Sequence, residues 1–333
     1  MPLNGIDAVV YGVANMAKCN AYFSDWGLKK VSGRKLGSVF ETRDGSEIII
    51  RPRSAKDLPK AIQRGSTVRE IIWGVTAQKD LNRIKRELSQ DRLVTIDADG
   101  TLHSLDDMGL GIAFRMTRRK NLRDNVQPMN SLANAGRINA RATYHKRAVP
   151  SHIGHCVFMA PDIEKMEKFY TERLGFRVSD YYTGRGVFMR ASPRGGHHNL
   201  FFLEAANNKP SINHVAFGVD DIHELFAGGI YFQNKKYKVA VGPGRHHVSS
   251  CYFWYFECPA GGSTEYFCDE DFLTDDWKPG NWDPAPETFA EWMLASGIKR
   301  EQVLPPTRER RDTQLKQKKK CPCSCRCMNV SLC

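Results

Sequence analysis

The sequence of 333 residues lacks long apolar runs, and no stretch approaches the roughly 18 residues that span a bilayer. Its first five residues, Met-Pro-Leu-Asn-Gly, also lack the basic start and apolar core of a signal peptide. Both absences argue against a membrane or secreted protein. We therefore expect a cytoplasmic protein with no membrane partner.

Zinc-type cysteine spacing is missing from the body of the chain. Five dispersed cysteines predict buried thiols in a reducing compartment: Cys19, Cys156, Cys251, Cys258 and Cys268. The other five crowd the C-terminus between Cys321 and Cys333, where a C-x-C-x-C-x-C run could bind a soft metal. We favour the plainer interpretation, an accessory tail outside the fold.

Basic residues interleaved with aromatic ones, the pattern of a single-strand nucleic-acid surface, are absent as well. The net charge is +12, but residues 308–333 carry eight Lys/Arg and two Asp/Glu, which is +6. Half of the excess therefore lies in a short tail with the composition of a disordered segment. A second basic stretch, 118–149, has the composition of a linker. We expect no specific nucleic-acid partner.

What the chain does contain is a repeat. Residues 6–28 and 153–176 each begin with an alternating apolar run, followed by a polar break and an amphipathic stretch, so the hydrophobic period changes from 2 to 3.6. Residues 68–81 and 212–225 are weaker copies with Gly-Val at the same offset. Short runs behind the copies predict further strands at 38–41, 48–51, 109–116, 177–182, 186–191, 199–204, 238–242, 251–258 and 264–268. The prediction is an α+β fold of four β-α-β-β-β modules in two pairs, each pair a curved, open-barrel sheet around a cavity.

The repeat also divides the chain. We predict an N-terminal module pair without a metal site (1–117), a basic linker (118–149), a C-terminal catalytic module pair (150–272), a C-terminal helical segment (273–304) and a basic, Cys-rich disordered tail (305–333). A helix is expected near residues 288–295. This segment could close the cavity mouth as a lid or dock on the back of the sheet, and the sequence does not separate the two.

Eight of the ten histidines lie between His152 and His247, within the second pair. Strand periodicity places His155 and His214 each on a face with small or apolar neighbours. Glu265 lies on the last strand, beyond a Pro-Ala-Gly-Gly turn that predicts a hairpin with Tyr255 opposite Glu265.

Two imidazoles and a carboxylate on inward faces would be costly to bury unpaired, and a divalent metal removes that cost. Two His and one carboxylate are the set of non-haem Fe(II) oxygenases, although Zn uses the same set for hydrolysis. In the first pair the aligned positions are Ala8, Glu70 and about Ile112, so that half is expected to bind no metal.

Four motifs of the second half resemble those of the type I extradiol ring-cleavage dioxygenases of the vicinal oxygen chelate (glyoxalase-like) superfamily, especially the biphenyl-2,3-diol and catechol enzymes. They are GHCVFMAPD around His155, RGGHHNLFF around His198, INHVAFGVDD around His214, and GPGRHHVSSCYFWYFECPAGGSTEYF, which ends near Glu265. The resemblance covers residues 149 to about 278, and the first half matches in architecture more than in motif.

The resemblance implies that His155, His214 and Glu265 bind Fe(II), with Mn(II) as a substitute metal. It implies extradiol (meta) cleavage of an aromatic diol with O2, with both oxygens incorporated, as in the catabolism of aromatic hydrocarbons. Relatives of this class commonly assemble, so we expect a homo-oligomer.

The resemblance also assigns catalytic roles by position. His198 would be the acid/base histidine beside the O2 site, with His197 as the alternative within the pair. His246 would contact the substrate, although a second histidine follows it, and Tyr255 would hydrogen-bond a ring hydroxyl. Two other functions remain open. One is a non-oxidative, metal-dependent isomerase, epimerase or lyase of the superfamily, and the other is a small-molecule-binding resistance protein.

Overall fold

A computed structural model describes residues 3–31, 37–123, 125–294 and 297, and these belong to one compact unit, residues 1–297. The Cys-rich tail expected at 305–333 lies outside the described residues. Within the described part of the chain, no helix is long and apolar enough to cross a membrane. The five dispersed cysteines are free and buried, as predicted.

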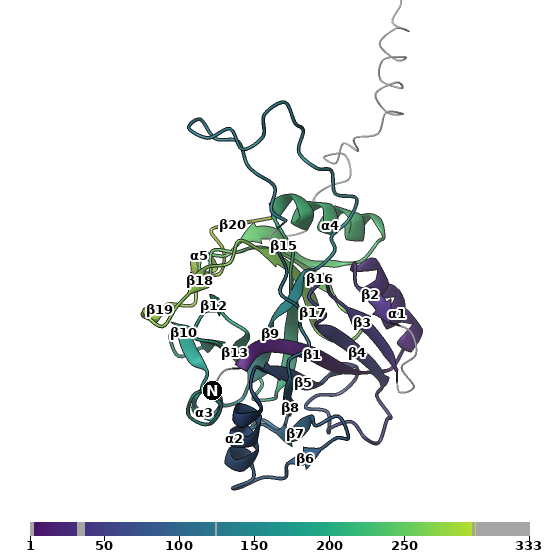
Figure 1. Ribbon diagram of the computed structural model, residues 1–333, viewed down its shortest axis with the longest axis vertical. Coiled ribbons are helices and arrows are strands. Elements are labelled where there is room, and N and C mark those ends of the chain that lie inside the picture. The colour runs from purple at the N-terminus through teal and green to yellow at the C-terminus, as the bar shows by residue number, and fades with distance from the viewer. Residues whose placement is uncertain (1–2, 32–36, 124, 295–296, 298–333) are drawn as a thin grey trace, which may run out of the picture. The chain divides into compact units, whose positions relative to one another are not determined.

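The first module pair (residues 3–116) forms an eight-stranded sheet in the order β2-β3-β4-β1-β5-β8-β7-β6 (Figure 1). Its long central strands β1 and β5 run antiparallel, while β4 lies parallel to β1 and β8 parallel to β5. Helix α1 (Met16–Asp25) follows β1, and helix α2 (Gln78–Leu88) follows β5. The strands are β1 (Leu3–Val13), β2 (Lys29–Val31), β3 (Ser38–Glu41), β4 (Glu47–Pro52), β5 (Thr67–Val75), β6 (Thr95–Ile96), β7 (Leu102–Leu105) and β8 (Gly111–Met116).

The second module pair (residues 152–268) repeats this arrangement in a ten-stranded sheet, β19-β10-β11-β13-β9-β14-β17-β16-β15-β20. Strands β9 and β14 are its antiparallel centre. Helix α3 (Ile163–Lys168) with the π-helical turn η1 (Phe169–Arg173) follows β9, and helix α4 (Ile222–Asn234) follows β14. The strands are β9 (His152–Ala160), β10 (Arg177–Tyr182), β11 (Gly186–Arg190), β13 (Leu200–Glu204), β14 (Ser211–Gly218), β15 (Val239–Arg245), β16 (Tyr252–Glu257), β17 (Ser263–Cys268), β19 (Gly280–Trp282) and β20 (Trp292–Met293). A separate ribbon pairs β12 (Gly195–Gly196) with β18 (Phe272–Leu273).

The predicted architecture is confirmed. Each sheet is built on two β-α-β-β-β modules whose first strands pair at the centre, so the fold contains four modules in two pairs. Strands β19 and β20 lie outside the modules and extend the second sheet at its two edges. The polar breaks in the repeat are helix caps. The carboxylates of Asp162 and Asp221 and the amide oxygen of Asn15 accept backbone N–H groups at the starts of α3, α4 and α1.

The helix expected near residues 288–295 was wrong in both length and position. The structure has a four-residue helix, α5 (Pro286–Phe289), after which the backbone becomes extended at Ala290 and forms β20. Strand β20 pairs with the edge strand β15, so tertiary pairing overrides the helical propensity of the segment. The described part of 273–304 also contains the short strand β19.

The two module pairs meet through an aromatic layer. Trp26, at the end of α1, stacks on Tyr266 of β17 with ring centroids 3.6 Å apart, and its edge meets Phe232 of α4 at 4.8 Å. The Tyr266 hydroxyl donates to the Trp26 carbonyl (2.7 Å). Tyr266 is adjacent to Glu265 in β17. The first pair therefore packs against the strand that carries this carboxylate and supports its position.

Replacing Trp26 with Ala should lower the free energy of unfolding by about 3–5 kcal/mol, because the indole is fully buried and its loss leaves a large cavity. Denaturant titration of the full chain measures this change. Trp292→Ala is the matched control, since that side chain is 43% exposed and its loss should cost less than about 1 kcal/mol. Equal losses for the two variants would contradict the buttressing role of Trp26.

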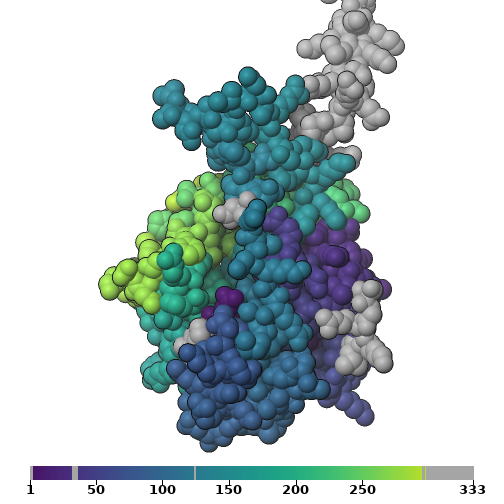
Figure 2. Space-filling view, viewed as in Figure 1, coloured from purple at the N-terminus to yellow at the C-terminus, as the bar shows by residue number. Residues whose placement is uncertain are grey.

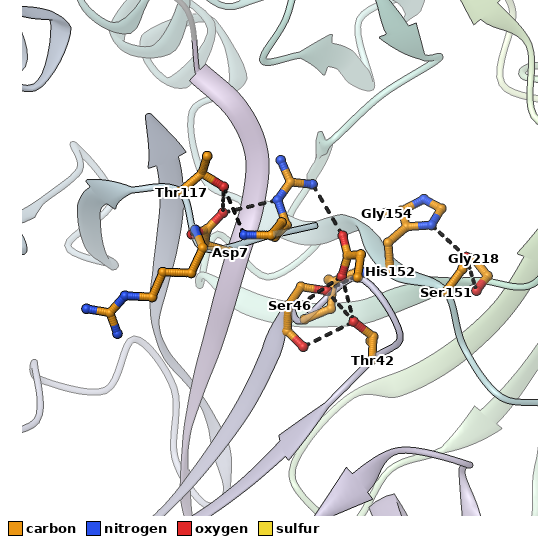
Figure 3. A network of polar contacts seen from close by, with 12 residues as sticks. Asp7, Thr42, Ser46, Thr117, Ser151, His152, Gly154 and Gly218 are labelled. Atoms are coloured by element: carbon orange, nitrogen blue, oxygen red, sulfur yellow. Dashed lines mark hydrogen bonds and ion pairs between the residues drawn. The ribbon is translucent and has the colours of Figure 1, made fainter. Parts of the chain in front are cut away.

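A polar network also joins the two pairs where β9 begins (Figure 3). The Ser46 hydroxyl accepts the backbone N–H of Ile153 (3.1 Å), and the Asp44 N–H donates to the Ser151 carbonyl (2.8 Å). Ser46 is itself bonded to Thr42. The turn between β3 and β4 therefore holds the start of β9, the strand that carries His155.

The segment 118–149 contains no helix or strand in its described residues and protrudes from the unit in the space-filling view, in teal (Figure 2). Several of its large apolar side chains are exposed, Leu132 completely. It connects the two pairs along the chain.

Candidate metal centre and active-site cavity

Three adjacent strands carry the predicted metal ligands. Strands β9, β14 and β17 lie side by side, and Ala216 of β14 is paired with His155 on one side and Glu265 on the other. His214 lies two residues before Ala216 and therefore on the same face. Gly154 precedes His155, and a Cβ there would lie 2.3 Å from the Phe267 ring, so the glycine leaves room for this ring to pack across β14 onto β9.

The three side chains converge on one point. His155 Nε2 lies 3.1 Å from Glu265 Oε2, His214 Nε2 lies 3.2 Å from the same oxygen, and the two Nε2 atoms are 3.3 Å apart. All three side chains are buried. Donor atoms held by a shared ion at about 2.1 Å would have spacings of this order. In the described residues, two other sets of ligand atoms could hold a metal, and both share residues with this one.

The protonation states also suit a metal. His214 Nδ1 donates to Asn213 Oδ1 (2.8 Å), which leaves the lone pair on Nε2. Burial, reinforced by the neighbouring His198, lowers the pKa of His155 to about 3, so this imidazole is neutral. Burial alone would raise the pKa of Glu265, but the neighbouring histidines, His155 first, hold it well below the ordinary value. Glu265 Oε1 is buried without a hydrogen-bond partner. A neutral His155, an ionised Glu265 and an unsatisfied carboxylate oxygen fit a divalent cation.

A cavity of about 350 Å³ opens in front of these ligands. Its polar wall includes His155, His214, His198, His246 and Tyr255. The apolar wall includes Val157, Phe188, Phe201, Leu203, Val248 and Phe289. A pocket of this size, mostly apolar with a few convergent polar groups, suits a small planar molecule.

The histidine pair 197–198 is divided between two roles. His198 lines the cavity, with its ring centroid 4.0 Å from that of His155, whereas His197 is fully buried behind it. His197 Nε2 lies 2.8 Å from Asp180 Oδ2, and its Nδ1 lies 3.2 Å from His198 Nδ1. Burial, together with the neighbouring His197, keeps the pKa of His198 well below its ordinary value.

These contacts assign the His198 tautomer. His197 donates Nε2–H to Asp180, so its Nδ1 is an acceptor. His198 Nδ1 faces this acceptor and also Glu270 Oε1, at 3.3 Å. A nitrogen between two acceptors carries the proton, so the lone pair of neutral His198 is on Nε2.

His246 and Tyr255 form a second polar pair at the cavity. His246 Nδ1 donates to the Phe289 carbonyl (2.7 Å), so its Nε2 accepts from the Tyr255 hydroxyl (2.9 Å). Burial raises the pKa of Tyr255 well above its ordinary value, which keeps the phenol protonated. Tyr255 pairs with Glu265 across the hairpin, as predicted. His247, by contrast, is exposed and packs on Trp282.

Phe289 settles the position of the segment after β17. This side chain lines the cavity, and its carbonyl holds His246, so α5 lies at the cavity and not on the back of the sheet.

Asp180, Glu270 and Asn213 are the site residues that sequence reasoning missed. They orient the histidines by hydrogen bonds and do not lie in the histidine-bearing motifs, apart from Asn213 beside His214. A carboxylate on a strand 17 residues before His197 gives no local signal of its role.

The first pair differs at all three ligand positions. Ile72 in the first pair corresponds to Ala216 in the second. Its two cross-strand partners are Ala8 and Ala113. The two partners of Ala216 are His155 and Glu265. The counterpart of Glu265 is therefore Ala113, one residue beyond the predicted position at about Ile112.

Comparison with known proteins places this site in context. Residues 152–266 match the family model described as the Glyoxalase/Bleomycin resistance protein/Dioxygenase superfamily. A curated relative, metapyrocatechase 2 from Cupriavidus necator, is 29% identical over 149 residues, which are 44% of this chain and 46% of that protein. The chain spans less than half the length of the curated relatives it matches.

Solved structures share the fold over nearly the whole chain. The Mn(II)-bound glyoxalase from Novosphingobium aromaticivorans is 22% identical, with a TM-score of 0.71 over 92% of this chain and 95% of that one. BphC, a halotolerant catechol dioxygenase, is 16% identical, with a TM-score of 0.66 over 92% of this chain and 98% of BphC.

Proposed function

We propose that the protein is an Fe(II)-dependent extradiol dioxygenase that cleaves a catechol-type diol with O2. The observation that carries the proposal is the convergence of His155, His214 and Glu265 at a cavity that also presents His198, His246 and Tyr255. In support, the metapyrocatechase relative matches 44% of the chain. The second module pair would perform the chemistry, and the first would support it.

His155, His214 and Glu265 would hold the metal. Bound there, Fe(II) would supply a shared centre for diol and O2 and the redox chemistry that the spin-forbidden reaction of O2 requires. Mn(II) would suit the same ligands.

The chain's own residues would position the ring and move protons. Phe188 and Phe201 are stacked, with centroids 3.7 Å apart, and form an apolar wall for an aromatic ring. The Tyr255 hydroxyl, already oriented by His246, lies where it can also bond a ring hydroxyl. His198 Nε2 carries a lone pair and would accept a proton from the substrate and later return it.

The main alternative is a non-oxidative reaction of the same superfamily, since a Mn(II)-bound glyoxalase shares the fold. A resistance-type binding protein is the other. A binding protein has no use for the Asp180–His197–His198 chain of hydrogen bonds, which prepares a proton acceptor at the cavity. An isomerase or epimerase would also need such an acceptor, and here the metapyrocatechase relative favours the dioxygenase.

The test is anaerobic loading of the full chain with Fe(II), addition of catechol or 2,3-dihydroxybiphenyl, and admission of O2. We expect O2 uptake, a yellow ring-opened product and, with ¹⁸O2, both labelled atoms in that product by mass spectrometry. If metal binds but a panel of such diols consumes no O2, the oxidative proposal fails and the non-oxidative alternative takes its place.

A further inference from the structure

The first module pair encloses a cavity of its own, of about 550 Å³. It occupies the place that corresponds, module for module, to the cavity of the second pair. Strand pairing fixes the correspondence: His103 is paired with Ala113 as Tyr255 is with Glu265.

Five wall positions are shared by the two cavities. With the residue of the first cavity given first, the corresponding pairs are Val10 with Val157, Ile49 with Phe201, Arg51 with Leu203, Glu70 with His214, and His103 with Tyr255. The first pair thus has a cavity at the same place in the module as the second, but with different side chains at these wall positions. Ala8 and Ala113 stand in the positions of His155 and Glu265, so the described residues of this pocket lack that metal triad.

A buried carboxylate is the central polar feature of this cavity. The Glu70 side chain is only 7% exposed, and Oε1 accepts from His103 Nδ1 at 2.9 Å. Among the described residues, His103 is its only polar side-chain partner. His103 Nε2 in turn lies 3.1 Å from Asp97 Oδ2, and the hydrogen bond to Glu70 raises the pKa of His103. Two carboxylates therefore share one imidazole.

The two arginines of the cavity wall, Arg51 and Arg92, already form ion pairs with other carboxylates. Arg51 Nη2 bonds both carboxylate oxygens of Asp57, at 2.8 and 2.9 Å. Arg92 pairs with Asp91 and Asp107. Glu70 and Asp97 are thus left with the single imidazole of His103 between them, and a buried carboxylate is stabilised by a further cationic partner.

An apolar surface completes the wall beside this charge. Val10, Ile49, Leu58 and Ile72 line the cavity. Ala8, Val10, Ile72 and Ala113 form one buried cluster, against which Ile49 and Leu58 pack. This surface suits a hydrocarbon body attached to the charged group.

We propose that the cavity of the first module pair binds a small organic ammonium ion, a primary amine on an apolar body about the size of one ring. The ammonium group would bond Glu70, and the body would pack on Val10, Ile49 and Ile72. This site is separate from the metal centre and does not depend on the function proposed for it.

Calorimetric titration of the full chain with benzylamine, with the neutral benzyl alcohol as the matched probe, tests the proposal. Benzylamine should bind about tenfold or more tightly than benzyl alcohol, since the ammonium–carboxylate bond is charge-assisted. Glu70→Gln should lower the affinity for benzylamine by about tenfold or more. Glu265→Gln, which changes the buried carboxylate of the other cavity, should leave its affinity within about twofold.

Three results would overturn the proposal: equal affinities for the two probes, no effect of Glu70→Gln, or a loss confined to Glu265→Gln. The last would place the amine at the metal ligands instead. If Glu70→Gln does not fold, Asp97→Asn changes the second carboxylate at a side chain that is 67% exposed. That variant should lower the affinity for benzylamine by about threefold, and an unchanged affinity would count against the site.

Discussion

His155→Ala should abolish metal retention. Within the part of the chain that the structure describes, the imidazole is one of three donors at the convergence point, and it is buried. Altering residues that merely orient a ligand already costs 10- to 100-fold in metal affinity, so loss of a ligand should cost more than about 100-fold. Metal analysis after loading with Fe(II) or Mn(II) and desalting measures the effect independently of turnover.

His223→Ala is the control for that experiment, because His223 is exposed on α4, away from the three ligands. It should retain metal at the wild-type level, about one ion per chain. A His155→Ala variant that kept its metal through desalting would show that the ion binds elsewhere. The described residues would then offer His246, Cys251 and Glu265 as the next set to test.

His198→Phe should keep the metal but slow turnover by roughly 10²–10⁴-fold, the range for a lost acid/base group. The substitution preserves ring packing against Phe188 while removing the Nε2 lone pair. Steady-state O2 uptake gives kcat and KM, and the fall should lie mainly in kcat. His247→Phe, in the exposed histidine next to His246, should leave both values within about twofold.

A normal rate in His198→Phe with full metal content would move the acid/base role to His197 or elsewhere. Asp180→Asn separates positioning from chemistry. The amide cannot hold His197 as an ionised carboxylate does, so the tautomer of His198 would no longer be fixed.

The triad and the fold were accessible from sequence because strand periodicity is a strong signal. Alternation decides which face a side chain occupies, so His155 and His214 could be placed before their strands were seen. The Pro-Ala-Gly-Gly turn fixed the hairpin register that opposes Tyr255 and Glu265. The position of Ala113 was missed by one residue because β5 and β8 are parallel, and no tight turn fixes their register.

What the sequence missed or left open depends on interactions between distant segments. The segment that follows Phe289 has helical propensity but pairs with β15, which lies more than 40 residues earlier. The division of roles between His197 and His198 depends on Asp180 and Glu270, carboxylates on opposite sides of the pair in the chain. Local composition carries no record of such contacts, so only the folded chain reveals them.

The Trp26 stack makes the boundary between the two pairs a poor place to divide the gene. A fragment beginning at residue 150 would expose to water the rings of Tyr266, Phe217 and Phe232, which Trp26 now covers. Contiguous aromatic patches of this kind promote aggregation. Chimaeras that exchange catalytic halves between relatives should therefore carry α1 and its indole along with the half they transfer.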